Sequence, residues 1–104
     1  MLVVFHDASS EPLALAAAVG AVQARANIRL RRLSPAADME YVAPRDADAE
    51  WAEAILIGVD CVTRYPGRVE GRIVETIDGD RGVEGARLQG RRVADRARSL
   101  RTKV

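Results

Sequence analysis

The chain has 104 residues, of which 48% are apolar, and a formal net charge of +1. This length fits one small domain, residues 1–104, and leaves no room for two. No apolar run approaches the ~20 residues needed to cross a bilayer, so we expect no membrane partner. The single cysteine excludes an internal disulfide and agrees with a reducing compartment, and a cytoplasmic location is the default.

The chain opens on a short apolar run that predicts a buried strand, Leu2–Phe5. A polar loop follows it. Ser10, at the end of this loop, is suited to cap a helix, and Pro12 is tolerated in a first turn. The opening segment therefore predicts a strand, a loop and the start of a helix.

The next segment predicts a helix over Leu13–Ala26, because Leu15, Val19 and Val22 recur at helical spacing in an alanine-rich stretch. Gly20 within it costs about 1 kcal/mol relative to alanine. We expect this glycine to permit a close approach to the sheet.

Alternating apolar and arginine residues over Ile28–Leu33 predict an edge or half-exposed strand. Strand, helix and strand within this length form a βαβ unit. A short helical turn is expected at Asp46–Ala52. Trp51 within it is interpreted as covering the edge of the core, with ligand binding as the alternative.

The run Ala54–Ile57, ending at Gly58, predicts the central strand, buried on both faces. Ligands of open α/β sheets sit outside the carboxyl ends of such strands. The loop from Val59 to Gly67 is therefore where a binding site is expected first.

After this loop, Val69, Ile73 and Ile77 lie at helical spacing and favour a helix, while the β-branched residues of Arg72–Ile77 leave a strand as the alternative. A turn at Asp78–Gly82 precedes the last helix, which is expected over about Val83–Arg101. Its stripe of mostly small residues suits close packing on a sheet or helix. The stripe consists of Ala86, Gly90, Val93, Ala97 and Leu100.

The terminal segment after Arg81 is rich in arginine, and the segment Asp38–Glu53 is rich in acids. A basic tail can indicate nucleic-acid binding. This tail has no aromatic residue for base stacking, so we interpret it as a solvated helix face or as a partner of the acidic segment. Nucleic acid is the weaker hypothesis.

Three stretches together resemble the flavodoxin-like NAD(P)H:quinone oxidoreductases, the family once called tryptophan-repressor-binding proteins. Asp7-Ala-Ser-Ser-Glu11 occupies the place of that family's phosphate loop, between its first strand and an alanine-rich helix. Thr63-Arg-Tyr-Pro-Gly67 is similar to the motif that wraps the flavin ring. Ala86-Arg-Leu-Gln-Gly90 resembles the start of the last helix.

The resemblance implies FMN as cofactor and electron transfer from NAD(P)H to a quinone. It implies Ser9 and Ser10 at the phosphate, and Thr63, Arg64, Tyr65 and Gly67 at the ring. For Ser9 and Ser10 the alternative role is helix capping. For Thr63, Arg64 and Tyr65 the alternative is an inherited surface loop without a binding role. Asp7 and Glu11 place negative charge beside the phosphate position.

The chain is shorter than members of the family. A flavodoxin-like domain has five parallel strands, whereas this sequence predicts only three. The predicted fold is thus a truncated flavodoxin-like α/β three-layer sandwich. Its parallel sheet has the order 2-1-3, with the first and last helices on one face and the Val69–Ile77 helix on the other. The loss of strands exposes the outer edge of Ile55–Ile57, so we expect a homodimer or higher oligomer that buries it. The alternative function is a non-catalytic, oligomeric remnant without flavin.

Two further residues have candidate chemistry. His6, at the carboxyl end of the first strand, could relay protons, although a structural role is favoured. Cys61 would need nearby cations and exposure to be reactive, and a packed cysteine is favoured. One histidine and one cysteine do not make a metal site. No catalytic residue is assigned, because no nucleophile and base are paired.

Overall fold

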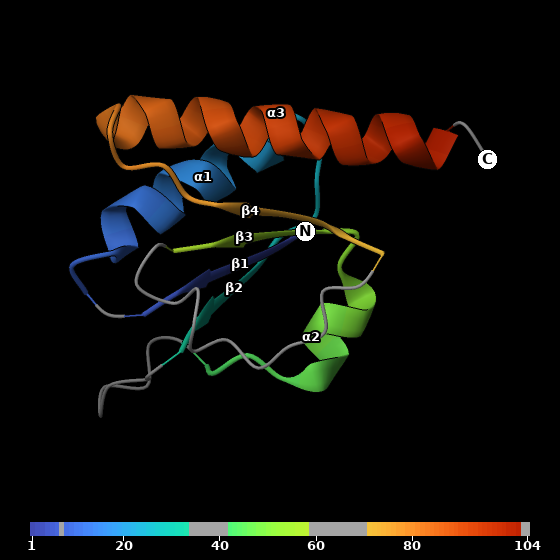
Figure 1. Cartoon of the computed structure of the whole chain (residues 1–104), viewed down its shortest axis with the longest axis horizontal. Helices are drawn as coiled ribbons and strands as arrows, with labels where there is room; N and C mark the ends of the chain where they lie inside the picture. The colour runs from blue at the N-terminus through green and yellow to red at the C-terminus, as the bar shows by residue number, and fades with distance from the viewer. Residues whose placement is uncertain (7, 34–41, 59–70, 103–104) are drawn as a thin grey trace.

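A computed structural model describes residues 1–6, 8–33, 42–58 and 71–102 of the chain (Figure 1). Four parallel strands form one sheet in the order β2-β1-β3-β4. The strands are β1 (Leu2–Phe5), β2 (Arg29–Arg32), β3 (Ala54–Ile57) and β4 (Ile73–Thr76). The predicted arrangement 2-1-3 is present within this sheet, including the ladder between β1 and β3. The predicted number of three strands is wrong.

The extra strand, β4, replaces the helix predicted over Val69–Ile77, and the strand alternative for Arg72–Ile77 is the better one. Residues 69 and 70 lie outside the described part of the chain. Ile73 and Ile77 are four positions apart, which places two side chains on the same side of both a helix and a strand. Their spacing is therefore ambiguous, and the β-branched residues between them favour the strand.

β4 covers the edge of β3 that a three-stranded sheet would leave exposed. The Ile73 N–H donates to the Glu53 carbonyl oxygen at 3.3 Å, and the Ile77 N–H donates to that of Ile57 at 2.8 Å. Because this edge of β3 is paired within the chain, it no longer gives a reason to expect self-association at the outer edge of Ile55–Ile57. The edges of the sheet are instead β2, as predicted, and β4.

Helices cover both faces of the sheet (Figure 1). α1 (Glu11–Gln23) and α3 (Gly82–Thr102) lie together on one face, as predicted, and the short α2 (Asp46–Trp51) lies on the other. Among the helices in the described ranges, none has the length and apolarity required to cross a membrane.

The larger core lies between the sheet and the α1–α3 pair. From the sheet it takes Val3, Phe5 and Leu56, all fully buried. From the helices it takes mainly alanines, together with Val93. The opposite face of the sheet has a smaller buried cluster. That cluster consists of Leu2, Val4, Ala52, Ile55 and Ile57.

α1 and α3 cross with their backbones nearly in contact. A Cβ atom at Gly20 would stand 2.7 Å from the carbonyl carbon of Arg87, and closer still to its oxygen. A Cβ atom at Gly90 would stand 2.7 Å from the carbonyl carbon of Ala17. The close approach that Gly20 permits is thus to a helix, rather than to the sheet as predicted.

The apolar stripe that predicts α1 faces outward. Leu15, Val19 and Val22 are 38%, 50% and 58% exposed. The buried side of the helix is instead formed by alanines and Gly20. Only small side chains fit that side, because α3 approaches there so closely.

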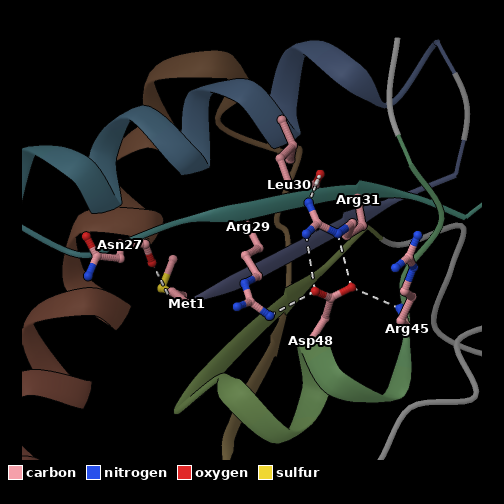
Figure 2. Close-up of polar contacts among 7 residues, drawn as sticks. All are labelled: Met1, Asn27, Arg29, Leu30, Arg31, Arg45 and Asp48. Carbon is pink, nitrogen blue, oxygen red and sulfur yellow. Dashed lines mark hydrogen bonds and ion pairs between the residues drawn. The ribbon is translucent and has the colours of Figure 1, made fainter. Parts of the chain in front are cut away.

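A buried carboxylate, Asp48, joins α2 to the edge strand β2 (Figure 2). Its Oδ1 accepts a hydrogen bond from Arg29 Nη1 at 3.1 Å, and its Oδ2 accepts one from Arg31 Nε at 3.0 Å. The Arg45 backbone N–H donates to Oδ2 at 2.9 Å, which caps α2. The Arg29 guanidinium also lies 4.2 Å from the ring centre of Trp51. Asp48 is therefore neutralised within the fold. Trp51 is 37% exposed and stacks with Arg29 rather than belonging to either buried cluster, so its expected role at the edge of the core stays a prediction.

The Asp48 contacts predict a loss of stability in acid. Burial raises the pKa of Asp48, but the hydrogen bonds from Arg45, Arg31 and Arg29 outweigh it, so the folded-state pKa lies below its ordinary value. A lowered folded-state pKa stabilises the fold above the unfolded pKa of about 4, and this stabilisation disappears as the pH falls through the folded-state pKa. We expect the free energy of unfolding, measured with urea at a series of pH values, to fall below about pH 4.

The variant Asp48→Asn should lose stability at neutral pH and show a flatter fall below about pH 4. The exposed carboxylate Asp46 lies in the same helix, so Asp46→Asn is the matched control. An unchanged pH profile in Asp48→Asn would contradict the role given to Asp48.

Candidate site at the carboxyl edge of the sheet

A groove of about 670 Å³ lies between the start of α1, with the two residues before it, and the carboxyl end of β4 with the turn that follows it. This volume falls in the usual range for small-molecule sites, about 300–1,000 Å³. The groove is lined by Ser9, Ser10, Leu13, Thr76, Ile77, Asp78, Gly79 and Asp80. In an open parallel sheet of this order, ligands bind at the carboxyl edge, where the strand order reverses between β1 and β3.

Ser9 and Ser10, predicted at the phosphate position, both line the groove. Ser10 is at the N-cap position of α1, but its side chain makes no capping hydrogen bond. Its backbone angles, φ −90° and ψ −12°, are helical, whereas a capping serine is usually extended. The capping role expected for the Ser10 side chain is therefore wrong.

The wall of the groove opposite Ser9 and Ser10 is formed by the turn between β4 and α3. Side-chain contacts from α3 hold this turn in place. Gln89 accepts a hydrogen bond from the Asp78 N–H at 2.9 Å and donates one to the Thr76 carbonyl oxygen at 2.8 Å. Asp78 Oδ1 accepts the Asp80 N–H at 2.9 Å. A Cβ atom at Gly79 would stand 3.1 Å from Leu13 Cδ1, so this glycine brings the turn against α1.

The groove combines apolar, hydroxyl and carboxylate groups. Leu13 and Ile77 offer an apolar surface, and Ser9, Ser10 and Thr76 offer hydroxyls. Two carboxylates, Asp78 and Asp80, also line it, and Glu11 lies in the first turn of α1. Such a groove can accept hydrogen bonds from a hydroxylated ligand and disfavours an anion, because like charges repel.

Sequence reasoning misses the wall formed by Thr76–Asp80, because it does not foresee β4. It identifies Asp78–Gly82 only as a turn, and a turn that follows a parallel strand lies at the ligand-binding edge. The ring-binding candidates Thr63, Arg64, Tyr65 and Gly67, like Cys61, lie outside the described residues. His6 follows β1 and is partly exposed at the same edge of the sheet. Across the described ranges, no cluster of acidic, histidine or cysteine side chains could hold a metal ion.

Two of the other hollows among the described residues are less suitable for a ligand. One, at the amino edge of the sheet, has about 130 Å³, below the usual range. There the amino terminus donates to the Asn27 carbonyl oxygen at 2.6 Å (Figure 2). The other, about 550 Å³, lies between β4 and α3, where Arg92 pairs with Glu75 at 2.7 Å. The charges of Arg92 and Glu75 neutralise each other there, so this pair leaves no net charge to attract a ligand.

No protein-family model matches the chain, and no curated protein sequence matches it.

Proposed function

We propose that the chain is a flavodoxin-like protein that binds a flavin in the groove at the carboxyl edge of its sheet. The observation that carries the proposal is the position of this groove, between Ser9–Ser10 after β1 and Thr76–Asp80 after β4. The parallel order β2-β1-β3-β4, with α1 and α3 on one face, supports it. Leu13, which is partly exposed beside the buried Ile77, provides an apolar contact for a ring.

The phosphate of FMN does not fit the described part of this groove. A phosphate requires backbone N–H donors or cations, and Pro12 removes one N–H from the first turn of α1. Asp78 and Asp80 add negative charge. Carboxylates accept hydrogen bonds from the hydroxyls of a ribityl chain, so these residues favour riboflavin over FMN.

A bound flavin would supply the two-electron chemistry that links a nicotinamide to a quinone. The role of the chain would be to bind and orient the ring and to exclude water from it. By resemblance, Thr63, Arg64, Tyr65 and Gly67 remain the residues proposed for the ring, and Ser9 and Ser10 those proposed for the phosphate end of the flavin.

A fluorescence titration with riboflavin and with FMN tests this function. We expect saturable quenching of riboflavin and about tenfold weaker binding of FMN, which corresponds to about 1.4 kcal/mol. The double variant Asp78→Asn/Asp80→Asn should reduce this difference, because it removes the negative charges that oppose the phosphate of FMN. The turn should be kept, because an asparagine oxygen at position 78 can still accept the hydrogen bond from the backbone N–H of residue 80.

A blocking variant gives the matched control. Ser9→Trp places a bulky ring in the groove and should abolish binding, whereas Ser99→Trp, at an exposed position on α3, should not. If neither flavin binds, or if Ser9→Trp binds as well as the unmodified chain, the proposed site is wrong.

The second candidate function is a non-catalytic protein that keeps the fold but does not bind flavin. The carboxylates in the groove favour it, because they oppose the phosphate of the family's cofactor. The same titration separates the two functions, since this candidate requires that neither riboflavin nor FMN bind at saturating concentration.

A further inference from the structure

Gln89 on α3 lies outside the lining of the groove, yet its side chain binds two main-chain atoms of the groove wall. Its Oε1 accepts the N–H of Asp78 at 2.9 Å, and its Nε2 donates to the carbonyl oxygen of Thr76 at 2.8 Å. Thr76 and Asp78 both line the groove. The position of this wall therefore depends on a residue behind it.

The two main-chain groups that Gln89 binds lie on the side of β4 away from β3. The amides of Ile73 and Ile77 donate to β3, and successive amides of a strand point to opposite sides. The Asp78 amide and the Thr76 carbonyl are therefore the donor and acceptor that a further strand would use. A glutamine carboxamide offers the matching acceptor and donor. This one side chain thus takes the place of a neighbouring strand where β4 passes into the turn.

A second acceptor fixes the orientation of the Gln89 carboxamide. Its Nε2 also donates to Glu75 Oε1 at 3.2 Å. Glu75 is ionised at neutral pH, because hydrogen bonds from the Arg92 guanidinium, at 2.7 and 3.0 Å, hold its pKa below the ordinary value. A carboxylate and a carbonyl oxygen can only accept, so the nitrogen of the carboxamide faces them. Its oxygen is then left to face the Asp78 amide.

The contact with Gln89 also sets the position of the negative charge in the groove. Asp78 is held by Gln89 through its amide, and its own Oδ1 accepts the N–H of Asp80 at 2.9 Å. Asp78 and Asp80 both line the groove, and their carboxylates oppose a phosphate there. Gln89 therefore acts on the charge of the groove through the backbone of the turn.

We propose that Gln89 is a positioning residue of the groove, which holds Asp78 and Asp80 where they select a hydroxylated flavin tail over a phosphorylated one. This inference rests on the proposed function, because it concerns the same groove and the same ligand. It adds a residue that determines specificity without touching the ligand. Removal of the Gln89 side chain leaves every group of the lining present but no longer fixes the turn.

Titration of the variant Gln89→Met with riboflavin and with FMN tests this role. Methionine is of similar length, but it has no N–H donor and its sulfur is a weak acceptor. We expect riboflavin to bind about tenfold more weakly, and its preference over FMN to shrink. Gln23→Met is the matched control, because Gln23 also accepts a hydrogen bond, from Arg87 Nη1 at 2.6 Å, but is the last residue of α1. It should bind both flavins as the unmodified chain does.

Amide hydrogen exchange, measured by NMR without a ligand, tests the contact itself. In Gln89→Met the amide of Asp78 should exchange faster, because it loses its acceptor. The amide of Ile77, which donates to the Ile57 carbonyl oxygen at 2.8 Å, should stay slow. A general loss of stability would accelerate both amides, so the comparison separates positioning from folding.

The possible outcomes separate this role from the proposed function. If neither flavin binds the unmodified chain, the proposed function is wrong and the role of Gln89 at the ligand is wrong with it. If riboflavin binds the unmodified chain, and Gln89→Met keeps the same affinity or the same preference over FMN, only the role of Gln89 is overturned. An unchanged exchange rate at Asp78, or an equal acceleration at Asp78 and Ile77, would also overturn that role.

Discussion

Replacing Gly90 by alanine is expected to lower the free energy of unfolding by about 3 kcal/mol or more, beyond the common range for overpacking. The added methyl group would overlap the backbone of Ala17 in α1, 2.9 Å from its Cα and closer to its carbonyl oxygen. A backbone cannot move aside as a flexible side chain does. The helices must therefore separate, which disturbs the core that they share with the sheet.

Gly20→Ala should have a similar effect, because its Cβ would meet the backbone of Arg87. Arg91→Ala is the control. Arg91 is exposed and follows Gly90 in α3, and alanine is a good helix former. Urea unfolding measures all three. A Gly90→Ala variant as stable as Arg91→Ala would contradict the close crossing of α1 and α3.

Replacing Glu75 by proline is expected to detach β4 and to lower the free energy of unfolding by about 2 kcal/mol or more. The amides of Ile73 and Ile77 donate to β3. Successive amides of a strand point to opposite sides, so the Glu75 amide also faces β3, and those of Val74 and Thr76 face away. Proline at position 75 therefore removes a hydrogen bond from the ladder.

Two control variants separate the contributions. Glu75→Ala removes only the side chain that pairs with Arg92 and leaves the backbone amide in place. Val74→Pro places proline where the amide faces away, and edge strands tolerate it there. We expect Glu75→Pro to be clearly less stable than both in urea unfolding. If Val74→Pro and Glu75→Pro are equally stable, the register of β4 is wrong.

The elements that sequence reasoning predicts well are those in which one signal dominates. Leu2–Phe5 and Ala54–Ile57 are continuous apolar runs, and both form fully buried strands. The long last helix has consistent periodicity, and α3 matches it closely. β4 is missed because its apolar residues recur every four positions, a spacing that a helix and a strand share.

The orientation of α1 could not be predicted from hydrophobicity. Its larger residues Leu15, Val19 and Val22 define the visible stripe, yet α3 packs on the side that carries Gly20. The close crossing selects small side chains, and alanine and glycine contribute little to a hydrophobic pattern. The buried side of α1 can therefore be told from its exposed side only by the contact between α1 and α3.

The candidate groove meets the sequence prediction only in part, because the loop from Val59 to Gly67, where a site is expected first, lies outside the described residues. The topology rule for parallel sheets identifies the carboxyl edge, and Ser9 and Ser10 do line the groove there. The contribution of Asp78 and Asp80 depends on β4, which brings their turn to this edge. Under the function proposed above, their carboxylates are the reason for proposing an unphosphorylated rather than a phosphorylated flavin.

A residue-by-residue NMR map of flavin binding tests most directly whether the groove is the flavin site. Amide shifts are recorded for the isotope-labelled chain as riboflavin is added. Binding in the groove predicts the largest shifts at Ser9, Ser10 and Thr76–Asp80, and small shifts around Asn27 at the opposite edge of the sheet. Shifts that are absent from the groove, or that concentrate at the amino edge, would contradict it.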